Sequence, residues 1–135
     1  MRHTAENATS LEGLALEKAR AGLGAGPTRV LFDRPRDDGP WWAIGASWKA
    51  SFDRGGFTFV PFFGSQAPQN HPLRVEVAAA SIGGTPLAVG QGEPVVADGQ
   101  VRTPRGPFVE VVDTRLDHVE QSFVFDRLPS RGAIT

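Results

Sequence analysis

The sequence predicts a mainly β protein: an antiparallel β-sandwich, jelly-roll-like or Greek-key in order, with one short N-terminal helix. Three observations support this prediction. Apolar and polar residues alternate over most of the chain after residue 28, and the 16 glycines and 11 prolines lie between these runs. No helical stretch separates the runs, although parallel strands need such a crossover. The 135 residues fit one domain.

The only helical pattern lies at residues 9–23. Thr9 is a capping residue, Glu12 follows it at capping-box spacing, and one face carries Leu11, Leu14, Ala15, Ala19 and Leu23. A glycine-rich stretch and Pro27 end the pattern. We therefore expect a helix and linker at residues 1–27 and a β module at residues 28–135, which continues into a further domain.

Residues 41–52 are predicted to form one strand. Their apolar face carries Trp42, Ile44, Ala46, Trp48, Ala50 and Phe52, which places Trp41 on the polar face. Residues 53–56 contain two glycines and predict a hairpin turn, followed by a return strand at residues 57–63. Pro61 lacks a backbone N–H, so we expect this return strand to lie at an edge of its sheet or to carry a bulge at Pro61.

Further strands are predicted at residues 73–79, 87–89, 95–96, 100–103, 108–112 and 119–125. The strand at 108–112 is apolar on both faces, which is typical of a central strand. Residues 133–135 follow a turn and are expected to begin another strand that is cut short.

Composition excludes several classes of site. The chain has no cysteine, which excludes disulfides, thiolate zinc sites and a cysteine nucleophile. Its net charge of −1, with basic and acidic residues intermixed, argues against a nucleic-acid partner. No run approaches the ~20 apolar residues of a membrane span, so we expect no membrane insertion. No common catalytic motif is present, and we expect no enzyme and no cofactor.

The predicted polar-face position of Trp41 suggests a ligand platform. Exposed indoles stack on the apolar faces of sugar rings, and Asp37 and Asp38 lie nearby to accept hydrogen bonds. The alternative is that the tryptophans are packing residues. A glycan site at Trp41, Asp37 and Asp38 is therefore one hypothesis.

An acidic set surrounds the turn before the last strand: Glu110, Asp113, Asp117 and Glu120, with His118 among them. Calcium takes six to eight oxygen ligands, so four carboxylates could supply part of such a shell. A pair of them could also serve a glycoside hydrolase, if a cleft separated the two by the required distance. The default interpretation is a solvated, charge-balanced turn, with His118 at the surface.

Three segments carry a resemblance to a known family: residues 39–52 with three tryptophans, the phenylalanine- and proline-bearing residues 57–63, and residues 119–125 with Glu120-Gln121 before Phe123. Together they resemble the N-terminal β-rich module of large extracellular bacterial proteins of the planctomycete and myxobacterial type. The resemblance covers about residues 28–135 and implies a secreted or cell-surface location. Residues 1–7 lack the apolar core of a signal peptide, so the location stays open.

The expected function is a non-catalytic structural or interaction module of a larger surface or secreted bacterial protein. Its partner would be the following domain or another protein, contacted through the strand edge near Pro61 and through residues 133–135, because unpaired edges recruit strands. The alternatives are the carbohydrate-binding module at Trp41 and the hydrolase at the acidic set.

Overall fold

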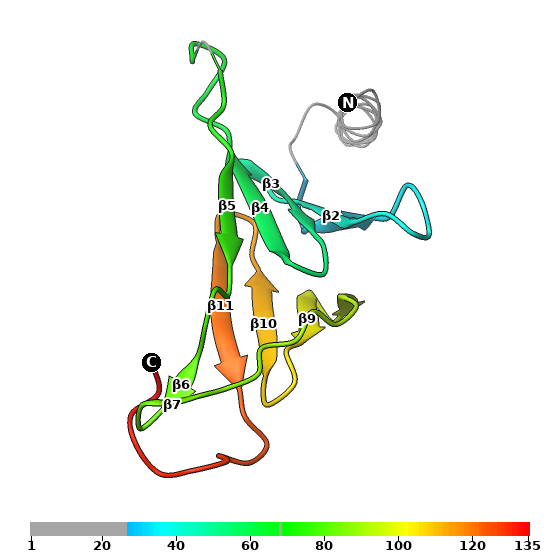
Figure 1. Cartoon of the computed structure of the whole chain (residues 1–135). Coiled ribbons are helices and arrows are strands. Elements are labelled where there is room, and N and C mark those ends of the chain that lie inside the picture. The colour runs from blue at the N-terminus through cyan, green and yellow to red at the C-terminus, as the bar shows by residue number, and fades with distance from the viewer. Residues whose placement is uncertain (1–26, 68) are drawn as a thin grey trace.

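A computed structural model describes residues 27–67 and 69–135, and these residues form a mainly β structure of antiparallel strands (Figure 1). The predicted helix at residues 9–23 lies outside the described residues. The first sheet is a five-stranded meander of β1 (Leu31–Asp33), β2 (Trp41–Ile44), β3 (Trp48–Phe52), β4 (Gly56–Pro61) and β5 (Leu73–Glu76).

The second sheet has four strands in the order β11-β10-β9-β8. Its strands are β8 (Val95–Ala97), β9 (Gln100–Pro104), β10 (Val109–Thr114) and β11 (Val119–Val124). A small hairpin of β6 (Ser81–Ile82) and β7 (Thr85–Pro86) lies between the two sheets in sequence. Ile134 bridges to Ile82, so the strand expected at residues 133–135 is reduced to one bridge and three backbone hydrogen bonds, two between Ser81 and Thr135 and one from the Gly83 N–H to the Ala133 carbonyl.

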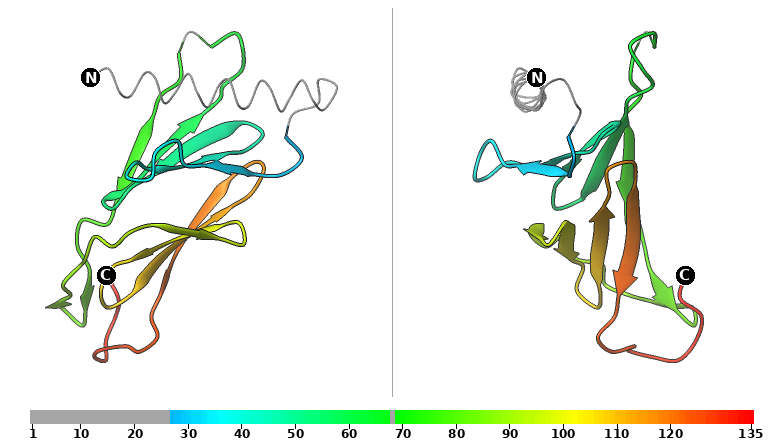
Figure 2. Two further views of the ribbon diagram at one scale, coloured as in Figure 1. Left: turned by 90° about the vertical axis from the view of Figure 1, so that its right-hand side faces the viewer. Right: turned by 180° about the vertical axis from the view of Figure 1, so that it is seen from behind.

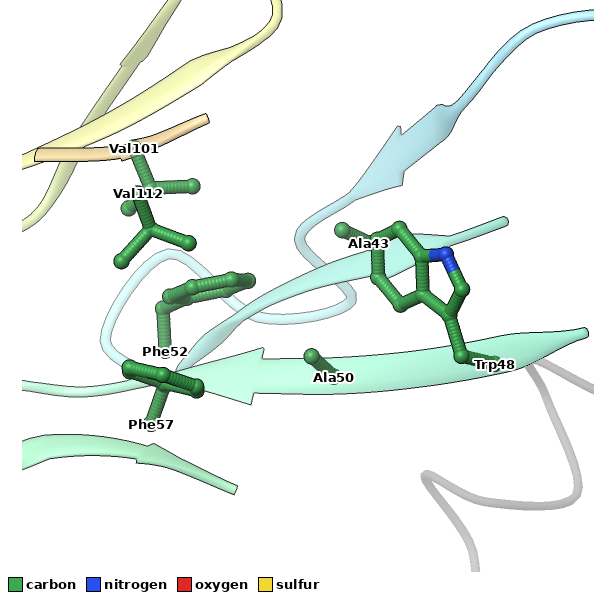
Figure 3. Close-up of a cluster of buried hydrophobic side chains, with 7 residues drawn as sticks. All are labelled: Ala43, Trp48, Ala50, Phe52, Phe57, Val101 and Val112. Atoms are coloured by element: carbon green, nitrogen blue, oxygen red, sulfur yellow. The ribbon is translucent and has the colours of Figure 1, made fainter. Parts of the chain in front are cut away.

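The two sheets share one hydrophobic core (Figure 3). The first sheet contributes Phe52 and Phe57, whose rings stack at 5.6 Å, and the second contributes Val101 and Val112. Trp48, Ala43 and Ala50 extend the cluster along the first sheet. All seven side chains are at most 4% exposed, and burial of this kind is the main stabilising term in folding.

The single strand predicted at residues 41–52 is wrong, because a hairpin turn divides it into β2 and β3. The Gly45 N–H donates to the Trp48 carbonyl at 2.9 Å. A Cβ at Gly45 would lie 2.2 Å from the Trp48 indole nitrogen, so only glycine fits. The turn also reverses the alternation: Trp41 packs against the core, whereas Trp42 lies on the other face of β2.

Tight turns join β2 to β3, β3 to β4 and the successive strands of the second sheet, whereas longer loops join β1 to β2 and β4 to β5. Asp98 and Gly99 both have positive φ values, of 52° and 73°, and close the β8–β9 hairpin, which a primed turn requires. Backbone hydrogen bonds from Arg105 to Phe108 and from Arg115 to His118 close the next two. The expected Greek-key or jelly-roll order is therefore corrected to two meanders among the described strands.

Pro61 ends β4 at a place where the ladder needs no N–H from it. β4 pairs with β3 up to Trp48↔Pro61, but its pairing with β5 stops at Phe59↔Leu73. β4 is thus a central strand and not the edge strand that Pro61 predicts; only its last two residues extend past the pairing with β5, which is why a proline is tolerated there. Beyond Pro61 the β4–β5 loop projects from one end of the molecule (Figure 2). Among the described residues, no helix has the length and apolar character to cross a membrane.

Candidate functional site

Three loops of the two sheets meet around a small pocket beside Trp41. They are the β1–β2 loop, the β3–β4 turn and the segment before β8. The pocket has a volume of about 300 Å³, near the lower end for small-ligand sites. Its lining combines apolar, acidic and basic residues: Asp38, Gly39, Pro40, Trp41, Phe52, Asp53, Arg54, Gly55, Glu93 and Pro94.

Two arginines hold the Glu93 carboxylate at the wall of this pocket. Arg34 Nη2 lies 2.6 Å from Glu93 Oε1, and Arg54 Nη2 lies 2.7 Å from Oε2. The Arg34 guanidinium also lies 5.4 Å from the centroid of the Trp41 ring, within cation–π range, and its Nε donates to the Gly39 carbonyl. Arg34 therefore fixes the indole, the β1–β2 loop and Glu93 relative to one another.

Asp53 organises the β3–β4 turn at the other side of the pocket. Its Oδ1 accepts hydrogen bonds from the N–H groups of Gly55 and Gly56, at 2.8 and 3.1 Å, and Arg74 donates to both carboxylate oxygens. Partial burial raises the pKa of Asp53, but the hydrogen bonds and the charge of Arg74 outweigh it, so the net pKa lies below its ordinary value. The hydrogen bond to Asp53 in turn raises the pKa of Arg74. Asp53 stays ionised at neutral pH.

Behind the turn lies a buried ion pair that the sequence analysis did not identify. Arg105 Nε and Nη2 donate to Glu110 Oε2 at 2.8 and 2.6 Å, and both side chains are at most 3% exposed. Gln121 Nε2 donates to the other Glu110 oxygen at 2.7 Å, while Arg105 Nη1 donates to the carbonyls of Arg54 and Gly90. The network ties the pocket turn to β10 and β11.

The structure brings together two of the three residues predicted for a glycan site. Asp38 and Trp41 both line the pocket, whereas Asp37 is exposed and lies outside the lining. Trp41 does not present the exposed platform expected from the alternation, because it is half-buried and packs against the core. It forms a pocket wall instead.

The predicted acidic set is distributed over different surfaces. Glu110 is buried with Arg105, whereas Asp113 lies three residues along β10 and so projects from the opposite face, where Gln100 Nε2 donates to it at 2.8 Å. Glu120 is exposed opposite Asp113. Asp117 pairs with the His118 ring in the exposed turn, and this hydrogen bond lowers the pKa of Asp117. No group of three potential metal ligands gathers in the part of the chain that the structure describes.

Sequence reasoning missed Arg34, Arg54, Glu93 and Arg105. The charged neighbours of a turn are usually solvated, and Arg105 stands in a Pro-Arg-Gly-Pro segment that is typical of an exposed turn. Its burial depends on a carboxylate five residues away and on carbonyls from two other loops. The one signal in the sequence was the position of Glu110 within a predicted central strand, because a carboxylate buried there would need a buried basic partner.

Exposed phenylalanines gather at the base of the β4–β5 loop. Phe62 and Phe63 are 55% and 63% exposed, and Leu73, at the start of β5, is 60% exposed. The Phe62 N–H donates to the Ser47 carbonyl at 2.8 Å, which anchors the base of the loop to the β2–β3 turn. We call Phe62, Phe63 and Leu73 the loop-base patch.

A larger hollow of about 640 Å³ lies between β1 and the β10–β11 turn. It is lined by mainly apolar residues with two arginines and no carboxylate: Arg29, Val30, Leu31, Phe32, Gly99, Thr114, Arg115 and Leu116. It therefore lacks the paired donors and acceptors that distinguish the Trp41 pocket.

No protein-family model, curated protein or solved structure shows significant similarity to the chain. The resemblance to extracellular bacterial β modules stays a prediction. Function must therefore be argued from the pocket and from the exposed apolar surface.

Proposed function

We propose that the chain is a non-catalytic β-sandwich interaction module of a larger bacterial surface or secreted protein. The supporting observation is the loop-base patch: three large apolar side chains, each more than half exposed, two of them just after β4 and one at the start of β5. The loop between these strands projects from the packed sheets (Figures 1 and 2). Large exposed apolar side chains near one another are common at interaction surfaces, because leaving them in water costs free energy that a partner recovers.

The position of the patch suits docking. On the β5 side, Pro61 at the end of β4 offers a carbonyl but no N–H, while Val60 directs its main-chain groups toward Lys49 of β3. A partner could cover the phenylalanines and donate a hydrogen bond to this carbonyl. This is the strand edge near Pro61 that the sequence predicts as a contact point. The following domain or another protein is the expected partner.

Site-specific photocrosslinking tests this proposal. A photoreactive phenylalanine analogue replaces Phe63 in the full chain, and a matched control places it at Val95, which is 55% exposed on β8. In the source cells we expect position 63 to crosslink to a defined protein and position 95 to give no such product. Equal crosslinking from both positions would show that the loop-base patch has no special role.

The second candidate function is carbohydrate binding in the Trp41 pocket. The pocket places an indole beside Asp38, Arg54 and Glu93, and sugars are held by such a combination of an aromatic wall and charged hydrogen-bonding groups. The Asp38 carboxylate makes no hydrogen bond or ion pair with the other described residues, which leaves its oxygens available to hydroxyl donors.

The matched pair Asp38→Asn and Asp37→Asn tests the carbohydrate candidate on a glycan array. Both residues are exposed, so neither change should lower stability, and only Asp38 lines the pocket. We expect Asp38→Asn to weaken binding and Asp37→Asn to leave it unchanged. Trp41→Ala is a poor test because Trp41 packs against the core. An array on which the unmodified chain binds nothing contradicts the candidate.

A further inference from the structure

A second apolar feature lies at the opposite end of the molecule from the loop-base patch. A cavity of about 290 Å³ is lined by Val77, Ala79, Ala80, Phe108, Phe123, Phe125, Ile134 and Thr135. Phe108 lies directly before β10, and Phe125 lies directly after β11. Figures 1 and 2 show this end of β10 and β11 beside the C-terminus, with the β4–β5 loop at the other end.

The walls of the cavity are aromatic. Phe108 contacts Phe123 edge-on, with ring centroids 5.6 Å apart and planes at 89°, and contacts Phe125 at 5.1 Å. Phe108 is buried, but Phe123 and Ile134 are 47% and 53% exposed at the rim. A further ring entering between them could make the edge-to-face contacts that aromatic pairs favour.

We propose that the cavity receives Phe62 or Phe63 of a second copy of this chain, so that copies associate head to tail. This inference rests on the proposed interaction role of the loop-base patch and names its partner. One end of the molecule carries exposed phenylalanines on a projecting loop, and the other carries an aromatic-lined cavity of side-chain size. A contact between two different surfaces builds a ring where the rotation between copies closes and an open chain where it does not, and in neither case an isologous twofold dimer.

The area available sets the strength of the contact. With one phenylalanine in the cavity and the other on its rim, the two rings bury roughly 300–500 Å² together, and the cavity and rim bury a similar amount, which gives about 600–1,000 Å² in total. Stable specific interfaces bury about 1,200–2,000 Å², so we expect a single contact to be weak. Tethering or crowding of copies would strengthen it through effective concentration.

Analytical ultracentrifugation of the full chain, from about 10 µM to about 1 mM, provides the test. We expect the weight-average mass to rise with concentration and to pass the dimer value. Phe62→Ser with Phe63→Ser removes the inserted group, and Ala79→Trp fills the cavity from an exposed position in its lining. Each variant alone should stay monomeric. The matched controls are Val95→Ser, on a distant edge, and Ala78→Trp, which is exposed and outside the lining.

Mixing the two variants gives the sharper result. The cavity-filled variant still has its phenylalanines, and the phenylalanine-free variant still has its cavity. An equimolar mixture should therefore form one-to-one pairs that grow no further. Urea midpoints close to that of the unmodified chain will show that the variants fold.

The proposal is overturned if the unmodified chain stays monomeric throughout, or if Ala79→Trp associates as strongly as Ala78→Trp. These outcomes are distinct from failure of the proposed function. A specific crosslink from position 63 to a different protein would keep the loop-base patch as a docking surface while removing the second copy as its partner. A monomeric chain without any specific crosslink would remove both.

Discussion

Replacing Glu110 with Gln should strongly destabilise the protein. The change preserves shape: the new amide oxygen can still accept from Arg105, and its NH₂ group can donate to the Gln121 amide after that amide rotates. What disappears is the negative charge. Arg105, which is 1% exposed, would then carry an uncompensated charge in the interior.

The expected loss is about 3–5 kcal/mol in the free energy of unfolding, which is typical when one partner of a buried ion pair is removed. This is a large share of the ~5–15 kcal/mol that stabilises an ordinary domain. Equilibrium urea unfolding followed by tryptophan fluorescence measures it. Glu120→Gln is the matched control, because Glu120 is exposed on the neighbouring β11 and should change stability by less than about 0.5 kcal/mol. A loss below about 1 kcal/mol for Glu110→Gln would refute the reasoning that the pair is desolvated.

Three further predictions concern single groups. Gly45→Ala should lower the free energy of unfolding by at least about 1–3 kcal/mol, because the added Cβ would lie 2.2 Å from Trp48 Nε1. Gly39→Ala is the control: its nearest contact would be 3.4 Å, so it should be nearly neutral in the same urea assay. The folded-state pKa of Asp53 is lowered, so the stabilising effect of its carboxylate is present above the ordinary pKa of 3.8 and is lost as the pH falls through the folded pKa. The difference in unfolding free energy between the wild type and Asp53→Asn should therefore be constant near neutral pH and shrink in acid. A difference that does not depend on pH would contradict the pairing of Asp53 with Arg74. Trp48→Phe should destabilise the protein by about 1 kcal/mol or more, since Trp48 Nε1 donates to the Arg115 carbonyl at 3.0 Å. Trp42→Phe should be neutral or stabilising, because the buried Nε1 of Trp42 has no acceptor among the described residues. Equal losses of stability in calorimetry would refute this distinction between the two tryptophans.

Local alternation was a sound guide to most strands and a poor one across a turn, although residues 87–89 form no strand and the strand predicted at 73–79 ends at Glu76. The hairpin at residues 53–56, the central position of β10 and the last strand β11 all follow from pattern and turn residues alone. The error at Trp41 arose because Gly45-Ala46-Ser47 fits an alternating strand as well as a turn. A hairpin turn at this point leaves the apolar spacing nearly intact but changes the face of the sheet on which the apolar residues of β2 lie. The close approach of the Trp48 indole to Gly45 decides the outcome, and that contact is tertiary.

The candidate site illustrates the same limit for charges. Asp38 and Trp41 were identifiable because they lie three residues apart in one loop and strand. Arg34, Arg54 and Glu93 belong to three segments that meet only after the two sheets have packed. The prediction of a site at the acidic set was wrong for the opposite reason, since Glu110 and Asp113 are close in sequence but project from opposite faces of β10. Proximity along a strand does not imply proximity in a site.

The buried ion pair also connects stability to the Trp41 pocket. Arg105 donates to the Arg54 carbonyl, and the Arg54 side chain in turn holds Glu93 at the pocket wall. A change at Glu110 should therefore disturb the pocket as well as the core, whereas a change at Asp38 should affect ligand contact alone. If the pocket binds a sugar, Glu110→Gln should weaken binding even at temperatures where the variant is fully folded. The loop-base patch is anchored separately, through Phe62 and Ser47, so its contacts should survive that substitution. The two candidate surfaces can thus be separated by one residue that touches neither ligand.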